Sequence, residues 1–147
     1  MIKVATSGHF DPLHRGHLEL LRLSKNIGEG VFIPSLYVII ASDRQLIAKY
    51  GFVLTPLHER VERLWRKAPF ITGVVVSVDS DDSVAETLKE IRPDIFTKGG
   101  DRTASNMNKI EIEACEDIGC KIIYGLGTKK AHSHLLRERI MRRYDKK

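Results

Sequence analysis

The sequence has 147 residues, of which 42% are hydrophobic and 29% are charged. A chain of this length and composition is typical of one globular domain, which excludes a largely disordered protein. The formal net charge is +5, and many of the basic residues follow Gly127. This charge suits an anionic partner, although a solvated helix face and a basic tail also account for it. Nucleic acid is not expected as a partner, because only Tyr144 adds an aromatic ring to those charges.

The cysteine content and the hydropathy pattern indicate a protein of the reducing cytoplasm. Cys115 and Cys120 have no second cysteine or histidine pair nearby to complete a zinc site, so we interpret them as packing thiols. The longest apolar run, residues 31–41, contains Pro34 and Ser35 and is too short to span a bilayer. No signal-peptide pattern opens the chain, and we therefore expect a cytoplasmic protein without a membrane partner.

The first third of the chain predicts a strand, a helix and a second strand. Residues 2–6 read as a short strand, and HLELLRLSK, residues 17–25, places its leucines at a mostly helical spacing. The continuous apolar run LYVIIA, residues 36–41, favours a strand that is covered on both faces.

The next unit has clear boundary residues. Thr55 is the expected N-cap of a helix, Pro56 its first residue, and Trp65 part of an apolar stripe that faces the core. GVVVSV, residues 73–78, predicts a third buried strand. An acidic turn follows, and then a helix over about residues 83–91 that is ended by a proline.

The remaining elements continue this alternation. DIFTKGG, residues 94–100, predicts a fourth strand, and KIEIEACEDIG, residues 109–119, a helix that ends at its glycine. KIIYG, residues 121–125, predicts a fifth strand, and SHLLRERIMRRY, residues 133–144, a last helix. Residues 1–147 therefore indicate a single α/β domain with a parallel sheet and helices on both faces. Because such sheets bind ligands beyond the carboxyl ends of their strands, SGHFD and TKGGD are expected to face one pocket.

The stretch GHFDPLHRGH, residues 8–17, concentrates three histidines where the first strand passes into the first helix. Gly8 and Gly16 allow a ligand to approach backbone N–H groups closely, and the N-terminus of a helix attracts anions. His14 and His17 are three residues apart across the helix start, so both rings can project to the same side. We therefore interpret this stretch as a phosphate site.

Two imidazoles at a phosphate site suit nucleotidyl transfer. When the nucleophile is itself a phosphate, its oxygen is anionic near neutral pH and no general base is required. The reaction then needs hydrogen-bond donors that stabilise charge on the α-phosphate and on the leaving pyrophosphate, and histidine N–H groups supply them. The alternatives are a structural role for the rings and a zinc site made by His9, His14 and His17. Neither explains the Gly-x-Phe-Asp frame around the histidines.

The chain resembles a known family in three stretches. SGHFDPLHRGH resembles the first signature of the cytidylyltransferase-like nucleotidyltransferases, Gly-x-Phe-Asp-x-x-His-x-Gly-His. RPDIFTKGGD resembles the second signature in the branch that includes the heptose-phosphate adenylyltransferases and the glycerol-3-phosphate cytidylyltransferases. TPLHERVERL is similar to a stretch of the family in which an arginine binds the phosphate of the substrate. The corresponding residue of this chain is Arg60. The resemblance extends from Val4 to about Ile140.

This resemblance implies a Rossmann-like three-layer sandwich with a five-stranded parallel sheet. It also implies that a phosphorylated acceptor attacks the α-phosphorus of ATP or CTP, and that pyrophosphate leaves with Mg²⁺, which is bound mainly through the triphosphate. The implied catalytic residues are His14 and His17. The expected nucleotide-binding residues are Gly8, His9, Phe10, Asp11, Gly16, Lys98, Gly99, Gly100, Asp101, Thr128, Ser133 and His134. The candidate contacts for the acceptor's phosphate are Arg60, Arg44, Lys49, Lys129 and Lys130.

Two features depart from the family pattern. The last helix of the family usually starts with hydroxyl residues, whereas this chain has TKKAHSHLL, in which Ser133 is the expected cap and His134 replaces a hydroxyl residue. Thr128 and the two lysines after it are the expected replacements as phosphate contacts. The link GEGVFIPS, residues 28–35, is a few residues longer than usual, and its role is left open.

The sequence leaves the base and the acceptor open. The Lys-Gly-Gly-Asp form favours ATP, and a sugar phosphate is the first expectation for the acceptor. Polyol phosphates, FMN, nicotinamide mononucleotide and phosphopantetheine stay as alternatives, and so does a homodimer. A catalytically idle nucleotide-binding module and a nucleic-acid-binding protein with a basic carboxyl end are the competing functions.

Overall fold

The computed structural model of the protein describes residues 1–127. Its strands form one parallel sheet in the order β3-β2-β1-β4-β5. The strands are β1 (Lys3–Gly8), β2 (Ser35–Ile40), β3 (Gly73–Val76), β4 (Ile95–Gly99) and β5 (Lys121–Leu126). The helices of this part of the chain are α1 (Arg15–Lys25), α2 (Asp43–Tyr50), α3 (Leu57–Lys67), α4 (Ala85–Ile91) and α5 (Lys109–Ile118). The expected Rossmann-like α/β fold is confirmed, whereas the last predicted helix lies outside the described residues.

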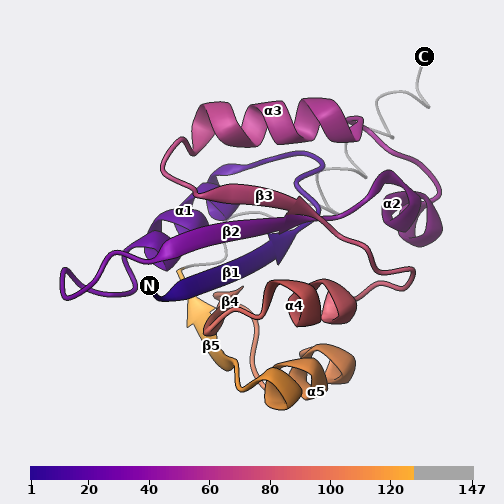
Figure 1. The fold of residues 1–147 in the computed structure, drawn as a ribbon. Coiled ribbons are helices and arrows are strands. Elements are labelled where there is room, and N and C mark those ends of the chain that lie inside the picture. Colours follow the sequence, from indigo (N-terminus) through magenta and orange to yellow (C-terminus); the bar gives the residue numbers. More distant parts are fainter. Residues whose placement is uncertain (128–147) are drawn as a thin grey trace.

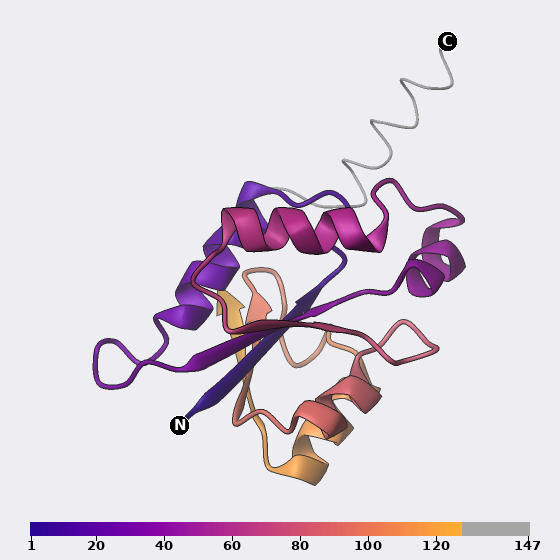
Figure 2. The same cartoon turned by 45° about the horizontal axis from the view of Figure 1, so that its top comes forward.

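The sheet separates two layers of helices and two hydrophobic cores. Helices α1 and α3 cover one face, and α4 and α5 cover the other (Figures 1 and 2). Val4 and Ala5, neighbours on β1, are both fully buried and belong to different cores, since successive strand residues point to opposite faces. Cys115 and Cys120 are free, buried thiols of the α4/α5 core, as expected.

The order of the strands places a crevice beside β1. The chain leaves β1 through α1 to reach β2 on one side, and β4 pairs with β1 on the other side. Connections that leave two neighbouring strands in opposite directions open a crevice at their carboxyl ends, where ligands of such sheets bind. Gly8 ends β1 and Gly99 ends β4, so both sequence motifs reach this crevice.

Helix α2 is an element that the sequence analysis did not predict. Its N-cap Ser42 accepts the backbone N–H of Gln45, and the Gln45 side chain accepts the backbone N–H of Ser42, which forms a capping box. The helix ends at Gly51, whose φ of 83° favours glycine.

The start of α3 differs from the prediction. Pro56 is the N-cap rather than the first helical residue, and its own side chain makes no capping hydrogen bond. The backbone N–H of Thr55 instead donates to the carboxylate of Asp11 at 2.7 Å. The predicted cap was wrong because Thr55 is held by a residue 44 positions earlier, a contact that local sequence does not reveal.

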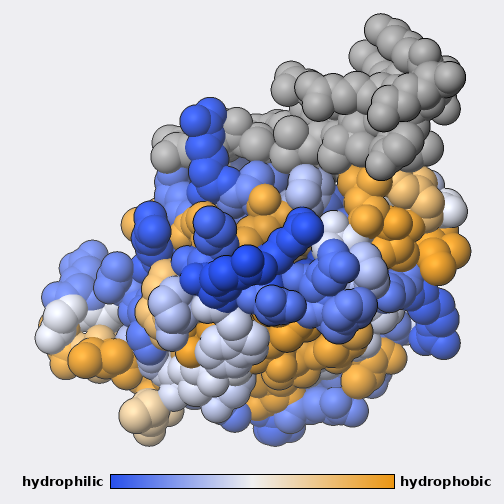
Figure 3. Space-filling view, turned by 90° about the horizontal axis from the view of Figure 1, so that it is seen from above, coloured by the Kyte–Doolittle hydropathy of each residue, from blue (hydrophilic) through white to orange (hydrophobic). Residues whose placement is uncertain are grey.

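Trp65 was also predicted wrongly, since 40% of its surface is exposed. The core-facing positions of α3 are taken by Leu64 and, unexpectedly, by Arg60. The outward face of the helix is hydrophilic (Figure 3). The link at residues 28–35 forms a projecting loop, at the left of Figure 1, where Val31 and Ile33 are 88% and 77% exposed. Among residues 1–127, no helix has both the length and the apolar character that crossing a bilayer requires.

Candidate active site

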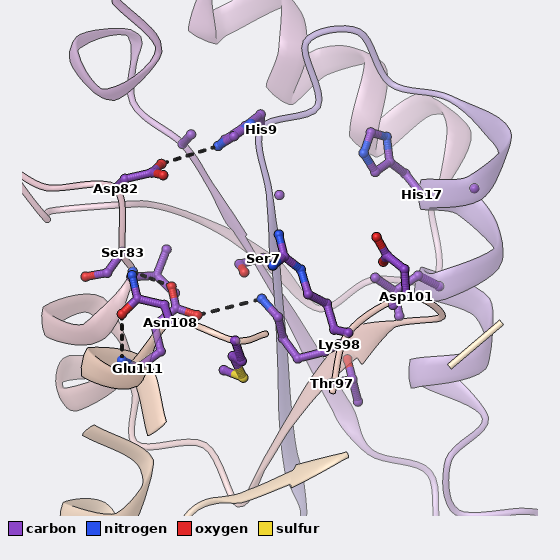
Figure 4. Close-up of a pocket in the computed structure, with 18 of the residues that line it drawn as sticks. Ser7, His9, His17, Asp82, Ser83, Thr97, Lys98, Asp101, Asn108 and Glu111 are labelled. Carbon is purple, nitrogen blue, oxygen red and sulfur yellow. Dashed lines mark hydrogen bonds and ion pairs between the residues drawn. The ribbon is translucent and has the colours of Figure 1, made fainter. Parts of the chain in front are cut away.

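A pocket of about 630 Å³ opens at the carboxyl ends of β1 and β4 (Figure 4). Residues from both sequence motifs line it, and Lys49 of α2 lies beside them. The predicted site residues in its wall are Gly8, His9, His14, Gly16, His17, Lys49, Lys98, Gly99, Gly100 and Asp101. Two stretches that are about 80 residues apart in the sequence therefore face one cavity, as the alternation of strands and helices predicted.

His14 and His17 form the N-terminal cap of α1. Nδ1 of His14 accepts the backbone N–H groups of Gly16 and His17, at 3.1 and 3.4 Å. Nδ1 of His17 accepts the backbone N–H of His14 at 3.1 Å, so the two rings make a reciprocal capping box. The rings are stacked, with centroids 3.6 Å apart and planes 19° apart.

This capping arrangement fixes which ring nitrogens can donate. An Nδ1 atom that accepts a hydrogen bond carries no proton, so each neutral ring has its proton on Nε2. The pKa of His17 is lowered from 6.5 to about 3, mainly by burial and in smaller part by the neighbouring His14 and His9. His17 is therefore neutral near pH 7. The two rings together place two Nε2–H donors side by side at the start of a helix that also attracts anions.

Phe10 packs against one of the two capping histidines and does not line the pocket. Its ring is 3% exposed and packs edge-on against His17, with centroids 4.8 Å apart. A Cβ atom at Gly8 would lie 2.8 Å from Cζ of Phe10. Packing inside the protein therefore favours glycine at residue 8, in addition to the close ligand approach that the sequence suggested.

Asp11 lies in the loop between β1 and α1 and is fully buried. Its carboxylate accepts the backbone N–H groups of Leu54 and Thr55, at 2.9 and 2.7 Å. The expectation that Asp11 orders this loop agrees with these bonds. Asp11 is not among the residues that line the pocket.

Arg60 lies beneath the site instead of in it, which corrects the expectation of a phosphate contact. Its side chain is fully buried and is not part of the pocket wall. Its guanidinium donates to the carbonyl groups of His9, Ala41 and Thr55 at 2.7 to 2.9 Å, and to the carboxylate of Asp43 at 2.7 Å. Arg60 thus ties the ends of β1 and β2 to the segment between α2 and α3. Although α3 carries many charged residues, Arg60 is therefore not part of its solvated face.

The middle of the pocket holds an ion pair between β4 and α5. Nζ of Lys98 lies 3.7 Å from the carboxylate of Glu111 and 4.9 Å from the centre of the Phe96 ring. Burial lowers the pKa of Lys98, and the Glu111 carboxylate opposes that shift. Glu111 also accepts the backbone N–H of Val84 at 3.1 Å. A largely buried charge pair whose lysine has a shifted pKa and that faces a cavity is a candidate for part of a functional site.

Helix α2 and the turn before α4 form the part of the pocket on the other side of His9 from His17 (Figure 4). Asp82 lies 3.0 Å from Nζ of Lys49 and 3.9 Å from Nε2 of His9. Nδ1 of His9 lies 3.2 Å from the Tyr50 hydroxyl, within hydrogen-bonding distance. We call this end of the pocket, with His9, Lys49, Tyr50 and Asp82, the α2 end.

Several pocket residues were not singled out from the sequence. They are Ser7, Gln45, Tyr50, Asp82, Ser83, Asn108 and Glu111. The Ser-x-x-Gln capping box at Ser42 was the available signal for α2 and thus for the pocket residues on it. Arg44 is exposed on α2 and does not line the pocket. The predictions for Thr128, Lys129, Lys130, Ser133 and His134 lie outside the described residues.

Known proteins are similar to this chain in sequence and in fold. Residues 5–139 match the model of the cytidylyltransferase-like family. The chain is 32% identical to an FAD synthase of Picrophilus torridus over 119 residues, which cover 80% of this chain and 78% of that protein. It is 30% identical to the bifunctional protein HldE of Desulfatibacillum aliphaticivorans over 82% of this chain and 23% of that protein. The crystal structure of a lipopolysaccharide core biosynthesis protein from Thermoplasma volcanium has the same fold, with a TM-score of 0.69 over 88% of this chain and 99% of that chain at 23% identity.

Proposed function

The chain belongs to the cytidylyltransferase-like family, and from that premise we propose that it transfers an adenylyl group from ATP to a small phosphorylated acceptor and releases pyrophosphate. The observation that carries this proposal is the reciprocal cap of His14 and His17, which orients two Nε2–H donors at the start of α1. Donors held in place before the reaction stabilise charge that develops in the transition state.

In the proposed reaction, an oxygen of the acceptor's phosphate forms a bond to the α-phosphorus of ATP. The bond between the α-phosphorus and the oxygen that leads to the β-phosphorus breaks, and pyrophosphate leaves with that electron pair. The nucleophile is already anionic, so no side chain has to remove a proton. His14 and His17 donate hydrogen bonds to the α-phosphate oxygens, and the first amides of α1 assist them.

The end of β4 is the proposed place for the nucleoside. A Cβ atom at Gly99 would meet no heavy atom of the described chain within 4 Å, so internal packing does not require glycine there. A ligand that lies against this backbone gives a reason for the glycine. We propose that residues 98–100 contact the base through their backbone and that Asp101, in the same wall, contacts the ribose. CTP is the second candidate donor.

We propose that Mg²⁺ binds to the pocket mainly through the triphosphate. No group of three or more potential ligands among His, Cys, Asp and Glu occurs within residues 1–127. Two of the pocket carboxylates, Asp82 and Glu111, are each paired with a lysine. Mg²⁺ commonly binds one or two carboxylates together with substrate phosphates, and Asp101 is the pocket carboxylate nearest the proposed ribose. When bound, the ion neutralises charge on the leaving pyrophosphate.

Two acceptors are supported by specific observations. FMN is favoured by the similarity to FAD synthases, because transfer of an adenylyl group to the phosphate of FMN forms the phosphoanhydride bond of FAD. A sugar phosphate is favoured by the polar side chains at the α2 end of the pocket and by the similarity to HldE. Both acceptors present a phosphate to the same α-phosphorus, so the proposed chemistry is identical.

Pyrophosphate release tests the proposal. ATP and CTP are each combined with FMN, nicotinamide mononucleotide, phosphopantetheine and a panel of sugar and polyol phosphates, and pyrophosphate and the adenylylated product are both measured. We expect one acceptor to support turnover with ATP. Tight binding of ATP without turnover of any acceptor would favour an idle nucleotide-binding module instead.

A further inference from the structure

The turn before α4 contains three aspartates, and only one of them faces the pocket. Asp79 accepts the backbone N–H groups of Glu86 and Thr87 at 2.8 and 3.1 Å, so it caps α4. Asp81 accepts the backbone N–H and the hydroxyl of Ser83, at 2.9 and 2.6 Å. These bonds account for both side chains. The Asp82 carboxylate instead lines the pocket wall and faces Lys49 and His9, which lie outside the turn.

Asp82 bridges two nitrogen groups that come from different elements. Its carboxylate lies 3.0 Å from Nζ of Lys49 on α2 and 3.9 Å from Nε2 of His9 at the end of β1. The Lys49 and Asp82 side chains are 37% and 55% exposed. The Tyr50 hydroxyl holds the other nitrogen of His9 at 3.2 Å. A carboxylate thus sits between a lysine and a histidine in a cavity, an arrangement in which both nitrogens can also bind a phosphate.

The backbone of the turn is held independently of the Asp82 side chain. The buried side chain of Gln45 donates to the carbonyl groups of Asp81 and Ser83, at 2.8 and 3.1 Å. The residues on both sides of Asp82 are therefore fixed to α2. The Asp82 carboxylate can rotate away from Lys49 while this backbone stays in place.

We propose that Asp82 competes with the acceptor's phosphate for Lys49 and His9, and so sets how strongly the α2 end of the pocket binds that phosphate. This inference rests on the proposed function, because it takes the α2 end as the acceptor's side of the reaction. A half-exposed lysine–carboxylate pair contributes little to stability, whereas a phosphate brings more charge and three strong acceptor oxygens. A phosphate therefore displaces the carboxylate from Lys49. The negative charge of Asp82 stays nearby and repels the phosphate, which lowers the affinity of the pocket for it.

The first test uses inorganic phosphate as the probe, because its binding does not require turnover. Asp82→Asn keeps the shape of the side chain and removes its charge. We expect this variant to bind inorganic phosphate about three- to tenfold more tightly than the wild type in calorimetry at constant ionic strength. Asp117→Asn is the matched control, since it makes the same change of charge at an exposed residue of α5 outside the pocket wall. The control is expected to bind phosphate like the wild type.

A second variant tests whether the gain acts through Lys49. Lys49→Met keeps a long side chain and removes the ammonium group that Asp82 contacts. We expect Lys49→Met to bind phosphate more weakly than the wild type. We also expect the double variant, Lys49→Met with Asp82→Asn, to show much less of the gain that Asp82→Asn gives alone, because the two side chains interact directly.

The outcomes separate this inference from the proposed function. Phosphate binding that is equal or weaker in Asp82→Asn than in Asp117→Asn overturns the inference, even if pyrophosphate release succeeds. Loss of turnover across the acceptor panel contradicts the proposed function, whatever phosphate binding shows. With an active acceptor, the inference further requires Asp82→Asn to lower the KM of the acceptor and leave the KM of ATP unchanged, and a raised acceptor KM overturns it.

Discussion

His14 both caps α1 and lines the pocket, and the substitution His14→Asn separates these roles. Nδ1 of His14 accepts two backbone N–H groups at the helix start. Oδ1 of an asparagine is attached at nearly the same place as Nδ1 of histidine, and asparagine is among the most favoured N-cap residues. Asparagine has no atom that reaches the position of Nε2. The variant therefore keeps the cap and loses the proposed donor to the α-phosphate.

The expected magnitudes follow from the two roles. His14→Ala removes the cap and is expected to lower the free energy of unfolding by about 1 kcal/mol, whereas His14→Asn is expected to stay within about 0.5 kcal/mol of the wild type. Loss of one preorganised donor typically lowers kcat about 100- to 1000-fold, which corresponds to about 2.7–4 kcal/mol. Both variants should therefore lose similar activity and differ in stability.

The assay combines pyrophosphate release at saturating ATP and acceptor with urea unfolding of both variants. ATP affinity is measured in parallel, and we expect little change, because the donor acts mainly where charge develops. Near-wild-type kcat in His14→Asn, with the helix cap intact, would refute the catalytic role of this ring. Equal instability of the two variants would refute the capping argument.

Three further predictions concern residues that support the site. Burial is the main reason why the pKa of His17 is about 3 instead of 6.5, so between these pH values the histidine binds a proton only in the unfolded chain. The free energy of unfolding should therefore fall as the pH is lowered from 6.5 towards 3. His17→Asn should flatten this slope in urea titrations across that range. Arg60→Met leaves buried carbonyl groups without a donor and should lower the free energy of unfolding by about 3–5 kcal/mol. Arg63→Met, on the exposed face of α3, should change it by no more than about 0.5 kcal/mol. Equal losses of stability in the two variants would contradict the buried role of Arg60. Gly8→Ala places a Cβ atom 2.8 Å from Phe10 and should lower the thermal midpoint, at a cost of about 1–3 kcal/mol, and an unchanged midpoint would speak against this packing.

The histidine stretch was predictable because its information is local. A strand that ends in glycine, a helix that begins a few residues later and the spacing of His14 and His17 all lie within one short stretch of sequence. The same is true of the end of β4, where the strand runs into two glycines. Since parallel strands of one sheet share their carboxyl edge, these two local signals were enough to place both stretches in one pocket.

The errors concern contacts between residues that are distant in sequence. Arg60 lies among charged residues on α3, and nothing local shows that carbonyl groups at the ends of β1 and β2 converge on its guanidinium. Trp65 fits an apolar stripe, but the face of α3 that meets the sheet is set by Leu64 and Arg60. Helix α2 is short and weakly patterned, so its capping box at Ser42 and the glycine that ends it, Gly51, were the local signals that could have revealed it. At the α2 end of the pocket, His9 and Lys49 were among the predicted site residues, whereas Tyr50 and Asp82 were missed.

The position of a bound nucleotide relative to His14 and His17 tests the central claim most directly. A crystal structure with ATP whose α,β-bridging oxygen is replaced by methylene would provide it. The account predicts that Nε2 of both rings lies about 2.7–3.1 Å from α-phosphate oxygens, with the base against the end of β4. A nucleotide whose α-phosphate lies away from both rings would contradict the account.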